Sequence, residues 1–578
     1  MQCQGMIDEL EIYNYGIGPI EAAQGGNVMS ATVAASPPSV QLGWRIAWVN
    51  GQNQQQPKTL TRRPLGGTNW TTLSTNVTGL TVTDTNVTVG SRYEYLLDFH
   101  DGLGTQEYIL SGINATPIDY RGKLILLVDQ TLTNALATNL TQLTQDLVGD
   151  GWKVIRHDAH RHDDATWSNN TNNIAVIKGW ITNDYNADPT NTKAVYIVGH
   201  VSIPFSGWLS PDGHGLRPFP ADGYYGSIGE TNWTDSLNPC CQTNGFYNIP
   251  NDGIFDQSVL PKNQFLGVGR ADFANMPAFN STNVPGVPPK SETDLLEQYL
   301  NKNHAFRNKA FQFADRSVAA SSYPPGSVGL FASADRTASR LYGFDSSRVD
   351  AGDPLAVTKN SHLIGFAAGY GNPNAMNVIG NDHHSADLAD PSKEPMVGFY
   401  VLSASYFGAW HLQDDFLRAT IATPTYGLEA MYAVLQVETQ LPLYLEPVGL
   451  GEPIAAAVTR TITNQEASVE ITLLGDPTLR FQVIAPPSGL AATTNQSSVI
   501  LNWTSSSEPG AQYFVYRSTN GLDGDFLRLS QAINTISYTD SSPPAGQKMY
   551  QVRAARIITA GSGSFTNLSQ AVFTTVNQ

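Results

Sequence analysis

Short, continuous apolar runs alternate with helical patterns along the middle of this 578-residue chain, and this alternation restricts its fold more than any other feature. The first run, "KLILLVDQ", precedes a segment whose leucines recur at helical spacing, at Leu132, Leu136, Leu140, Leu143 and Leu147. "WKVIRHD" predicts a second strand, "IAVIKGWITNDY" a helix and "KAVYIVGH" a third strand. This order requires right-handed crossovers and a mainly parallel sheet covered on both faces.

Three further apolar runs continue the pattern, namely "NQFLGVGR", "HLIGFAAG" and "GFYVLSAS". Ligands of mainly parallel sheets bind beyond the carboxyl ends of the strands. Residues that directly follow these runs are therefore the first candidates for a functional site.

The two ends of the chain have a different period from its middle. "SVQLGWRIAW" near the start and "SVILNW" near the end alternate apolar and other residues. In both segments a Thr-Asp pair is followed six residues later by a glycine, from Asp84 to Gly90 and from Asp540 to Gly546. Period-two strands separated by Gly, Pro and Asn turns are typical of antiparallel sandwiches.

These segments resemble fibronectin type III modules over residues 29–118 and 485–578, and the resemblance places Trp44 and Trp503 in their cores. Residues 1–25 belong to neither module, because "GMIDELEIYNYGIGPIEA" resembles the closing strand of a laminin-G or concanavalin-like lectin sandwich. A lone terminal strand cannot bury itself. We therefore expect the chain to be the tail of a longer polypeptide, or a processed product, with any signal peptide upstream.

Composition and charge exclude several classes of partner. The formal net charge of −17, without a Lys/Arg cluster, disfavours nucleic acid. The longest apolar runs are far shorter than the ~20 residues of a membrane span, so no span is expected. A hydrophobic content of 41% with 14% charged residues is globular, and the length predicts three or four domains of about 100–200 residues.

Four landmarks in the middle of the chain carry a resemblance to a known family. "KAVYIVGHVSIP", "ADGYYG", "FLGVGRAD" and "LLGDPTLRF" occur in the order seen in gingipain-type cysteine peptidases. The resemblance implies a caspase-like α/β domain with a mainly parallel sheet over residues 120–483. The predicted fold is thus multidomain, with this domain flanked by two all-β, immunoglobulin-like (fibronectin type III) sandwiches.

The same resemblance predicts that the catalytic pair is lost. The family uses a cysteine thiolate after one central strand and a histidine, usually in His-Gly, after the preceding strand. The imidazole deprotonates the thiol and protonates the leaving amine. Here Tyr370 precedes Gly371 where the resemblance places the histidine, and Ser405 stands at the cysteine position. Residues 263–265 carry no carboxylate where the family has one.

An active endopeptidase or other hydrolase with a rearranged site is the alternative. A serine hydroxyl needs a base. Four histidines are candidates for activating Ser405: His362, His383, His384 and His411. A thiolate of Cys240 or Cys241 is a second possible nucleophile, although adjacent cysteines also form vicinal disulfides. The competing interpretation of Ser405 is a small residue packed in a tight turn.

Metal binding has two possible bases in the sequence. "RHDAHRHDD" and "GNDHHSADLAD" are rich in His and Asp but lack HExxH spacing, and solvated loops explain them equally well. Carboxylates crowd the stretch between "VGH" and "VGR", which suits calcium, and gingipain-type domains commonly carry structural calcium. The candidate metal ligands are Asp222, for calcium, and Asp382, which lies in the second His- and Asp-rich segment. The candidate binding residues are Gly371, Asp222 and Tyr225. An Asp-Gly turn with Tyr225 packed on the sheet is the structural alternative. We expect no organic cofactor.

Together these features predict a secreted or cell-surface protein whose peptidase-like domain binds or assembles rather than cleaves. The expected partner is a protein, peptide or glycan, or another copy of the chain. A structural subunit of an extracellular filament or surface layer is a further alternative, which would need a self-contact above about 1,000 Å².

Overall fold

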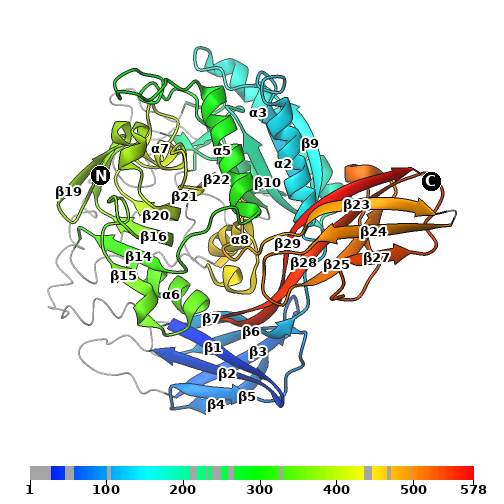
Figure 1. The fold of residues 1–578 in the computed structure, drawn as a ribbon. Coiled ribbons are helices and arrows are strands. Elements are labelled where there is room, and N and C mark those ends of the chain that lie inside the picture. Colours follow the sequence, from blue (N-terminus) through cyan, green and yellow to red (C-terminus); the bar gives the residue numbers. More distant parts are fainter. Residues whose placement is uncertain are drawn as a thin grey trace.

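In the computed structural model, a central α/β domain packs against two β-sandwich modules that also adjoin each other (Figure 1). The structure describes residues 28–45, 57–100, 106–207, 218–229, 232–236, 249–257, 266–323, 330–434, 445–464, 470–495 and 497–577. Within these ranges no helix is long and apolar enough to cross a membrane. The predicted strand at residues 1–25 lies outside them.

A ten-stranded sheet forms the core of the central domain, in the order β15-β14-β16-β20-β21-β22-β13-β10-β8-β9. In chain order its strands are β8 (Gly122–Asp129), β9 (Trp152–Ala159), β10 (Thr192–Val198), β13 (Gly267–Ala271), β14 (Ser317–Ser321), β15 (Val349–Ala351), β16 (His362–Ala368), β20 (Val397–Ser403), β21 (Glu429–Val434) and β22 (Glu470–Gly475). These include the apolar runs of the sequence, so the predicted strands are confirmed.

Strand direction divides this sheet into two halves. Among its described neighbouring pairs only β21 and β22 are antiparallel. The strands from β15 to β21 therefore run opposite to those from β22 to β9. As a consequence, the carboxyl ends of the two halves lie at opposite edges of the sheet. The segment after β20 nevertheless reaches residues of the second half, because Trp410 lies against Arg270 and Arg418 lies 3.9 Å from Asp272.

Helices cover both faces of the sheet, as the crossover rule predicts (Figure 1). Alternate residues of β8 separate the faces: Leu124 and Leu126 pack in one cluster with α2 and α5, while Ile125 packs in another with α3. A capping box at Ser291 and Asp294 begins α5. The helices are α2 (Ala137–Gly149), α3 (Trp167–Ala187), α4 (Gly223–Gly226), α5 (Glu292–Arg307), α6 (Leu330–Tyr342), α7 (Phe416–Ile421) and α8 (Ile454–Asn464).

Each flanking module is a sandwich with its predicted tryptophan in the core. Trp44 belongs to the buried cluster of the first module and Trp503 to that of the second. The first module contains β1 (Val28–Ala35), β2 (Pro38–Arg45), β3 (Lys58–Pro64), β4 (Thr71–Val77), β5 (Thr81–Asp84), β6 (Arg92–Asp98) and β7 (Gln106–Ala115). The second contains β23 (Ser488–Asn495), β24 (Ser498–Thr504), β25 (Gln512–Ser518), β26 (Leu527–Arg528), β27 (Ser537–Asp540), β28 (Gln547–Ala560) and β29 (Gly563–Asn577).

The repeated Thr-Asp pair has the same role in both modules. The hydroxyl of Tyr95 donates to Asp84 at 2.9 Å, and that of Tyr550 donates to Asp540 at 2.8 Å. Each aspartate also binds an arginine of the opposite sheet of its sandwich. When the two modules are aligned on their aspartates, the tyrosines fall one position apart. The reason is that the first module has one more residue between its aspartate and its tyrosine.

One sheet continues through both modules, in the order β26-β25-β28-β29-β7-β6-β3-β4. The long β28–β29 hairpin leaves the second module and reaches β7 and α6 (Figure 1). At its tip the backbone N–H of Gly561 donates to Leu341, and its carbonyl accepts from Ala31 at 2.6 Å. The hairpin therefore connects all three parts of the molecule.

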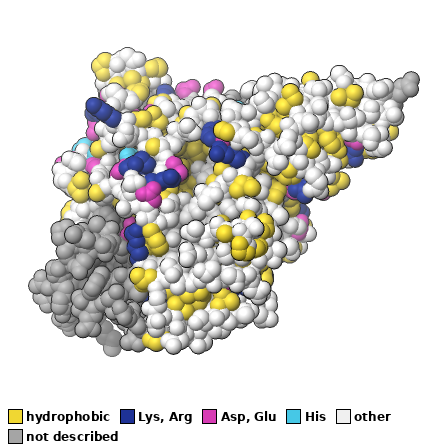
Figure 2. All heavy atoms as spheres, turned by 60° about the horizontal axis from the view of Figure 1, so that its bottom comes forward, with side chains coloured by type: hydrophobic (Ala, Val, Ile, Leu, Met, Phe, Trp, Pro, Cys, Tyr) yellow, Lys and Arg dark blue, Asp and Glu magenta, His cyan; other side chains and the backbone are white. Residues whose placement is uncertain are grey.

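The surface carries no separation of charge on the face that Figure 2 shows. Basic and acidic side chains lie next to one another there, and apolar side chains form several separate groups between them. Mixed charge of this kind is usual for a globular surface.

Candidate functional site

The ends of two neighbouring strands, in the half of the sheet from β15 to β21, bring the predicted catalytic positions together. β16 and β20 are parallel neighbours, with Ala368 opposite Ser403. Tyr370 and Ser405 each follow two residues later. A Cβ added to Gly371 would lie 2.8 Å from the Cβ of Ala404, so the two segments are in direct contact.

Tyr370 presents its side chain to solvent at this edge. It begins β17 (Tyr370–Asn372) and is 60% exposed. Its ring lies edge-on to that of Tyr323, with 5.0 Å between centroids, and the Tyr323 hydroxyl donates to the Gly369 carbonyl. The position thus carries a phenol where the resemblance places an imidazole.

Ser405 is half-buried in the turn after β20. The next residue, Tyr406, has φ = 68°, in the left-handed region that is uncommon for residues other than glycine. Of the histidines considered in the sequence, His362 binds Asp350 at 2.9 Å, and His411 packs edge-on against Phe205 with centroids 4.8 Å apart.

His383 belongs to a small sheet beside this site. β17 pairs with β18 (Ala375–Val378), which pairs with β19 (Asn381–His384). The His383 ring binds the buried Asp353 at 2.7 Å, and Asp382 accepts from Asn377 at 2.7 Å. The contact with Asp353 fixes the small sheet on the loop after β15, whereas the bond between Asn377 and Asp382 joins β18 to β19.

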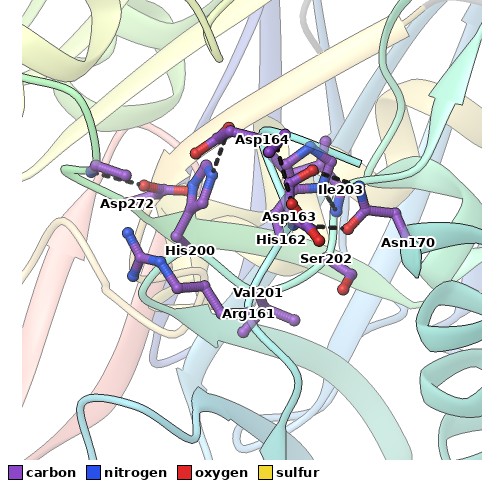
Figure 3. Close-up of polar contacts among 12 residues, drawn as sticks. Arg161, His162, Asp163, Asp164, Asn170, His200, Val201, Ser202, Ile203 and Asp272 are labelled. Carbon is purple, nitrogen blue, oxygen red and sulfur yellow. Dashed lines mark hydrogen bonds and ion pairs between the residues drawn. The ribbon is translucent and has the colours of Figure 1, made fainter. Parts of the chain in front are cut away.

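The other edge of the sheet carries a cluster that joins His162 and Asp164, from the His- and Asp-rich segment "RHDAHRHDD", to two residues that the sequence did not single out, His200 and Asp272. His200 follows β10 and is 3% exposed. Its Nδ1 lies 2.8 Å from the buried Asp272, which follows β13, and its Nε2 lies 3.3 Å from Asp164, which follows β9 (Figure 3). His162 meets the His200 ring edge-on at 5.3 Å and accepts from the Ile203 N–H.

The carboxylates keep His200 charged. Burial alone would lower the pKa of His200, but Asp272 and Asp164 raise it to about 9. Burial would raise the pKa of Asp272, but His200 and two buried arginines hold it far below its usual range. Burial and the charge on His200 together lower the pKa of His162 to about 4. At neutral pH His200 is therefore an imidazolium held between two carboxylates, which makes it a structural ion pair rather than a base.

Asp222, from the sequence landmark "ADGYYG", lies at the same edge of the sheet. Both of its carboxylate oxygens accept from the buried Arg270, at 2.7 and 2.8 Å, and Arg270 lies beneath the Trp410 ring. The Tyr225 hydroxyl donates to the Ser202 carbonyl at 2.6 Å. Asp222 thus stabilises an arginine, and Tyr225 packs in the core as the structural alternative expects.

The side chains of the His- and Asp-rich segments bind different partners in the structure. His157 binds Asp184, and the side chain of Asp163 accepts from the start of α3. Among the residues that the structure describes, no group of three or more His, Cys, Asp or Glu side chains is arranged to hold a metal ion. Calcium at Asp222 and a metal ion at Asp382 stay predictions.

Several predicted residues lie outside the described ranges, namely Cys240, Cys241 and residues 263–265. Sequence reasoning missed His200 and Asp272 although their signal is present: "VGH" ends one apolar run and "VGRAD" ends another. A histidine and an aspartate directly after two strands of one parallel half-sheet meet at its carboxyl edge.

Comparison with known proteins gives similarities of fold only. No family model and no curated protein matches the chain. A solved structure described as "Structure of Protease" is 12% identical, with a TM-score of 0.44 over 79% of this chain and 97% of that one. A Fn3-like protein from Clostridium thermocellum is 25% identical, with a TM-score of 0.12 over 15% of this chain and 93% of that one. The fn3 domain of human collagen alpha-1(XX) is 21% identical, with a TM-score of 0.14 over 17% of this chain and 87% of that one. The structural neighbours thus include a protease and fibronectin type III-like domains.

Proposed function

We propose that the chain is a secreted or cell-surface protein whose central, gingipain-type domain binds an extended polypeptide without cleaving it. One observation carries this proposal: Tyr370, exposed at the end of β16, stands beside the Ser405 segment where peptide cleavage would need an imidazole. The sequence landmarks support the domain assignment, since "YIVGH" ends β10, "GVGR" lies in β13 and "GDPTLR" follows β22.

The geometry around Tyr370 suits an extended ligand. β17 is the edge strand of the three-stranded sheet β17-β18-β19, and its residues are exposed or half-buried. An edge strand can accept an added strand through main-chain hydrogen bonds. The exposed ring of Tyr370 offers the large, rigid contact that commonly dominates peptide binding.

Covalent labelling separates binding from catalysis. We expect serine- and cysteine-directed probes, a fluorophosphonate and an iodoacetamide, to leave position 405 unlabelled in the folded chain. In an immobilised peptide array, Tyr370→Ala should lose at least tenfold in affinity, because an aromatic anchor is removed. Tyr120→Ala removes a comparably exposed tyrosine elsewhere and should leave binding unchanged. A fluorophosphonate adduct at Ser405 that disappears in Ser405→Ala would overturn the proposal.

A serine hydrolase is the second candidate, and the backbone of Tyr406 favours it. Nucleophiles of many hydrolases sit in strained turns after a strand, and φ = 68° directly follows Ser405 here. The same labelling experiment tests this candidate.

A further inference from the structure

A cavity of about 640 Å³ opens beside the Tyr370 site. It lies between β14, β15 and α6, and the end of β2 also contributes to it. Its walls are largely apolar and include Ala334, Ala338 and Phe344. Tyr323 and Ile379 line it on the side of Tyr370. Cavities of about 300–1,000 Å³ are typical of ligand sites.

One carboxyl group in this cavity has no counter-charge bound to it from the part of the chain that the structure describes. Asp335 on α6 is half-buried and makes no hydrogen bond or ion pair with any described residue. The neighbouring Arg45 instead donates to the Phe344 carbonyl at 2.9 Å and stacks on the Phe344 ring. Burial raises the pKa of Asp335 to about 6, so the group is ionised at neutral pH.

The other two carboxylates that line the cavity are already occupied. Asp345 accepts from Ser347 and pairs with Arg348 at 3.3 Å. Asp350 binds Arg316 and His362. Arg45 and three serines also line the cavity, and the charge of Arg45 partly opposes the effect of burial on the pKa of Asp335. Among the described lining residues, Asp335 is thus the carboxylate that has no bound partner, and it lies within a largely apolar wall.

A strained residue stands at the mouth of the cavity. Ile379 and Gly380 connect β18 and β19 with φ of 47° and 87°. A hairpin turn with two positive φ values favours Asn-Gly, whereas a β-branched residue is strained there. Ile379 is nevertheless 51% exposed and lines the cavity. Asparagine would form this turn more easily than isoleucine. The isoleucine side chain, however, adds an apolar wall at the mouth of the cavity, and this explains its presence in a strained turn.

The geometry points to a binding site for the free amino terminus of a peptide with an apolar first residue. The α-ammonium group pairs with Asp335, the first side chain lies against the alanines and Phe344, and the chain leaves past Tyr323 and Ile379 toward Tyr370. This inference rests on the proposed function and names the end of the peptide that the Tyr370 site would hold.

Calorimetric titration of the full chain with short peptides tests it. Leu-Leu-Ser-amide should bind at least tenfold more tightly than its N-acetylated form, because acetylation removes the charge that Asp335 pairs with. Asp335→Asn should abolish this difference while the Tm stays within about 2 °C. Asp345→Asn is the matched control, since that carboxylate also lines the cavity but is already bound, and it should preserve the difference.

Ile379→Asn provides a test that does not depend on charge. The substitution should relax the turn and leave the Tm unchanged or higher. It should also lower the affinity for the peptide with a free amino terminus at least threefold. Equal affinity of the acetylated peptide, an effect of Asp335→Asn equal to that of Asp345→Asn, or unchanged affinity in Ile379→Asn would each contradict the site. Asp335-dependent binding of acetyl-Leu-Lys-amide in place of the free amino terminus would also overturn it.

Failure of this inference can be told from failure of the proposed function. Tyr370-dependent binding of longer peptides, without any effect of acetylation, would remove the amino-terminal site and leave the proposed function standing. Labelling of Ser405 together with Asp335-dependent binding of the tripeptide would remove the proposed function and leave the amino-terminal site standing.

Discussion

At the scale of single residues, Glu429 shows how burial can fix a protonation state. It begins β21, is fully buried, and neither carboxylate oxygen has a hydrogen bond in the described part of the chain. Burial raises its pKa well above the usual value, and the nearby Asp476 raises it further. The folded state therefore holds a neutral acid where the unfolded chain ionises above about pH 4.5.

We predict that Glu429→Gln stabilises the protein at pH 8 but not at pH 4. Because the folded-state pKa is raised, wild-type stability is full below the unfolded pKa and falls as pH rises toward the folded one. The amide is neutral throughout and escapes this loss. Thermal unfolding should give a variant Tm at least about 2 °C higher at pH 8 and equal at pH 4. The exposed Glu297→Gln is the control, and equal shifts at both pH values would refute the prediction.

Residue patterns predicted individual positions well where burial decides them. The resemblance to fibronectin type III modules predicted Trp44 and Trp503 in the cores, and they are there. Asp335 carried no such signal, since only the packing of α6 beside β14 and β15 makes a carboxyl group on that helix part of a cavity.

At the scale of elements, the β28–β29 hairpin has a tip without room for a side chain. A Cβ added to Gly561 would lie 2.0 Å from the carbonyl oxygen of Ser339 in α6, and 2.2 Å from the amide nitrogen of Gly343. Contacts this short force a shift of backbone, and such overpacking commonly costs about 1–3 kcal/mol. The tip thus needs glycine for close approach.

Gly561→Ala should therefore lower the Tm by several degrees and expose the hairpin to limited proteolysis. Gly179→Ala is the matched control, because nothing lies within 4 Å of a Cβ at that position of α3. Alanine there should stabilise the helix by about 0.5–1 kcal/mol. If Gly561→Ala behaved like Gly179→Ala, the tip would not be a tight contact.

Sequence periodicity predicted the existence of the central strands and helices, but not the direction of strands across the sheet. Right-handed crossovers order strands within one half, as from β8 to β10. The reversal depends on β22, which returns after residues 435–469 to pair antiparallel with β21. No local pattern encodes that partner, so the separation of the His200 and Tyr370 groups to opposite edges could not be foreseen.

At the scale of the whole molecule, a buried ion network connects the central domain to the second module. Asp150 is fully buried, with Arg480 2.7 Å and Arg121 3.2 Å from its carboxylate. Arg553, on β28 of the second module, approaches to 3.5 Å, and Arg307 to 4.0 Å. Burial alone would raise the pKa of Asp150, yet these arginines lower it. One carboxylate thus balances a group of buried cations at the junction.

We predict that Asp150→Asn loosens the second module from the central domain. Removing one partner of a buried ion pair leaves uncompensated charge and costs about 3–5 kcal/mol. Scanning calorimetry should show a separate, earlier transition for the module, and small-angle scattering should give a larger radius of gyration. Asp525→Asn breaks an ion pair with Lys153 at the same junction, but that aspartate side chain is 74% exposed, and exposed pairs contribute about 0–1 kcal/mol. Equal, small effects of both variants would show that apolar and backbone contacts, rather than Asp150, hold the module in place.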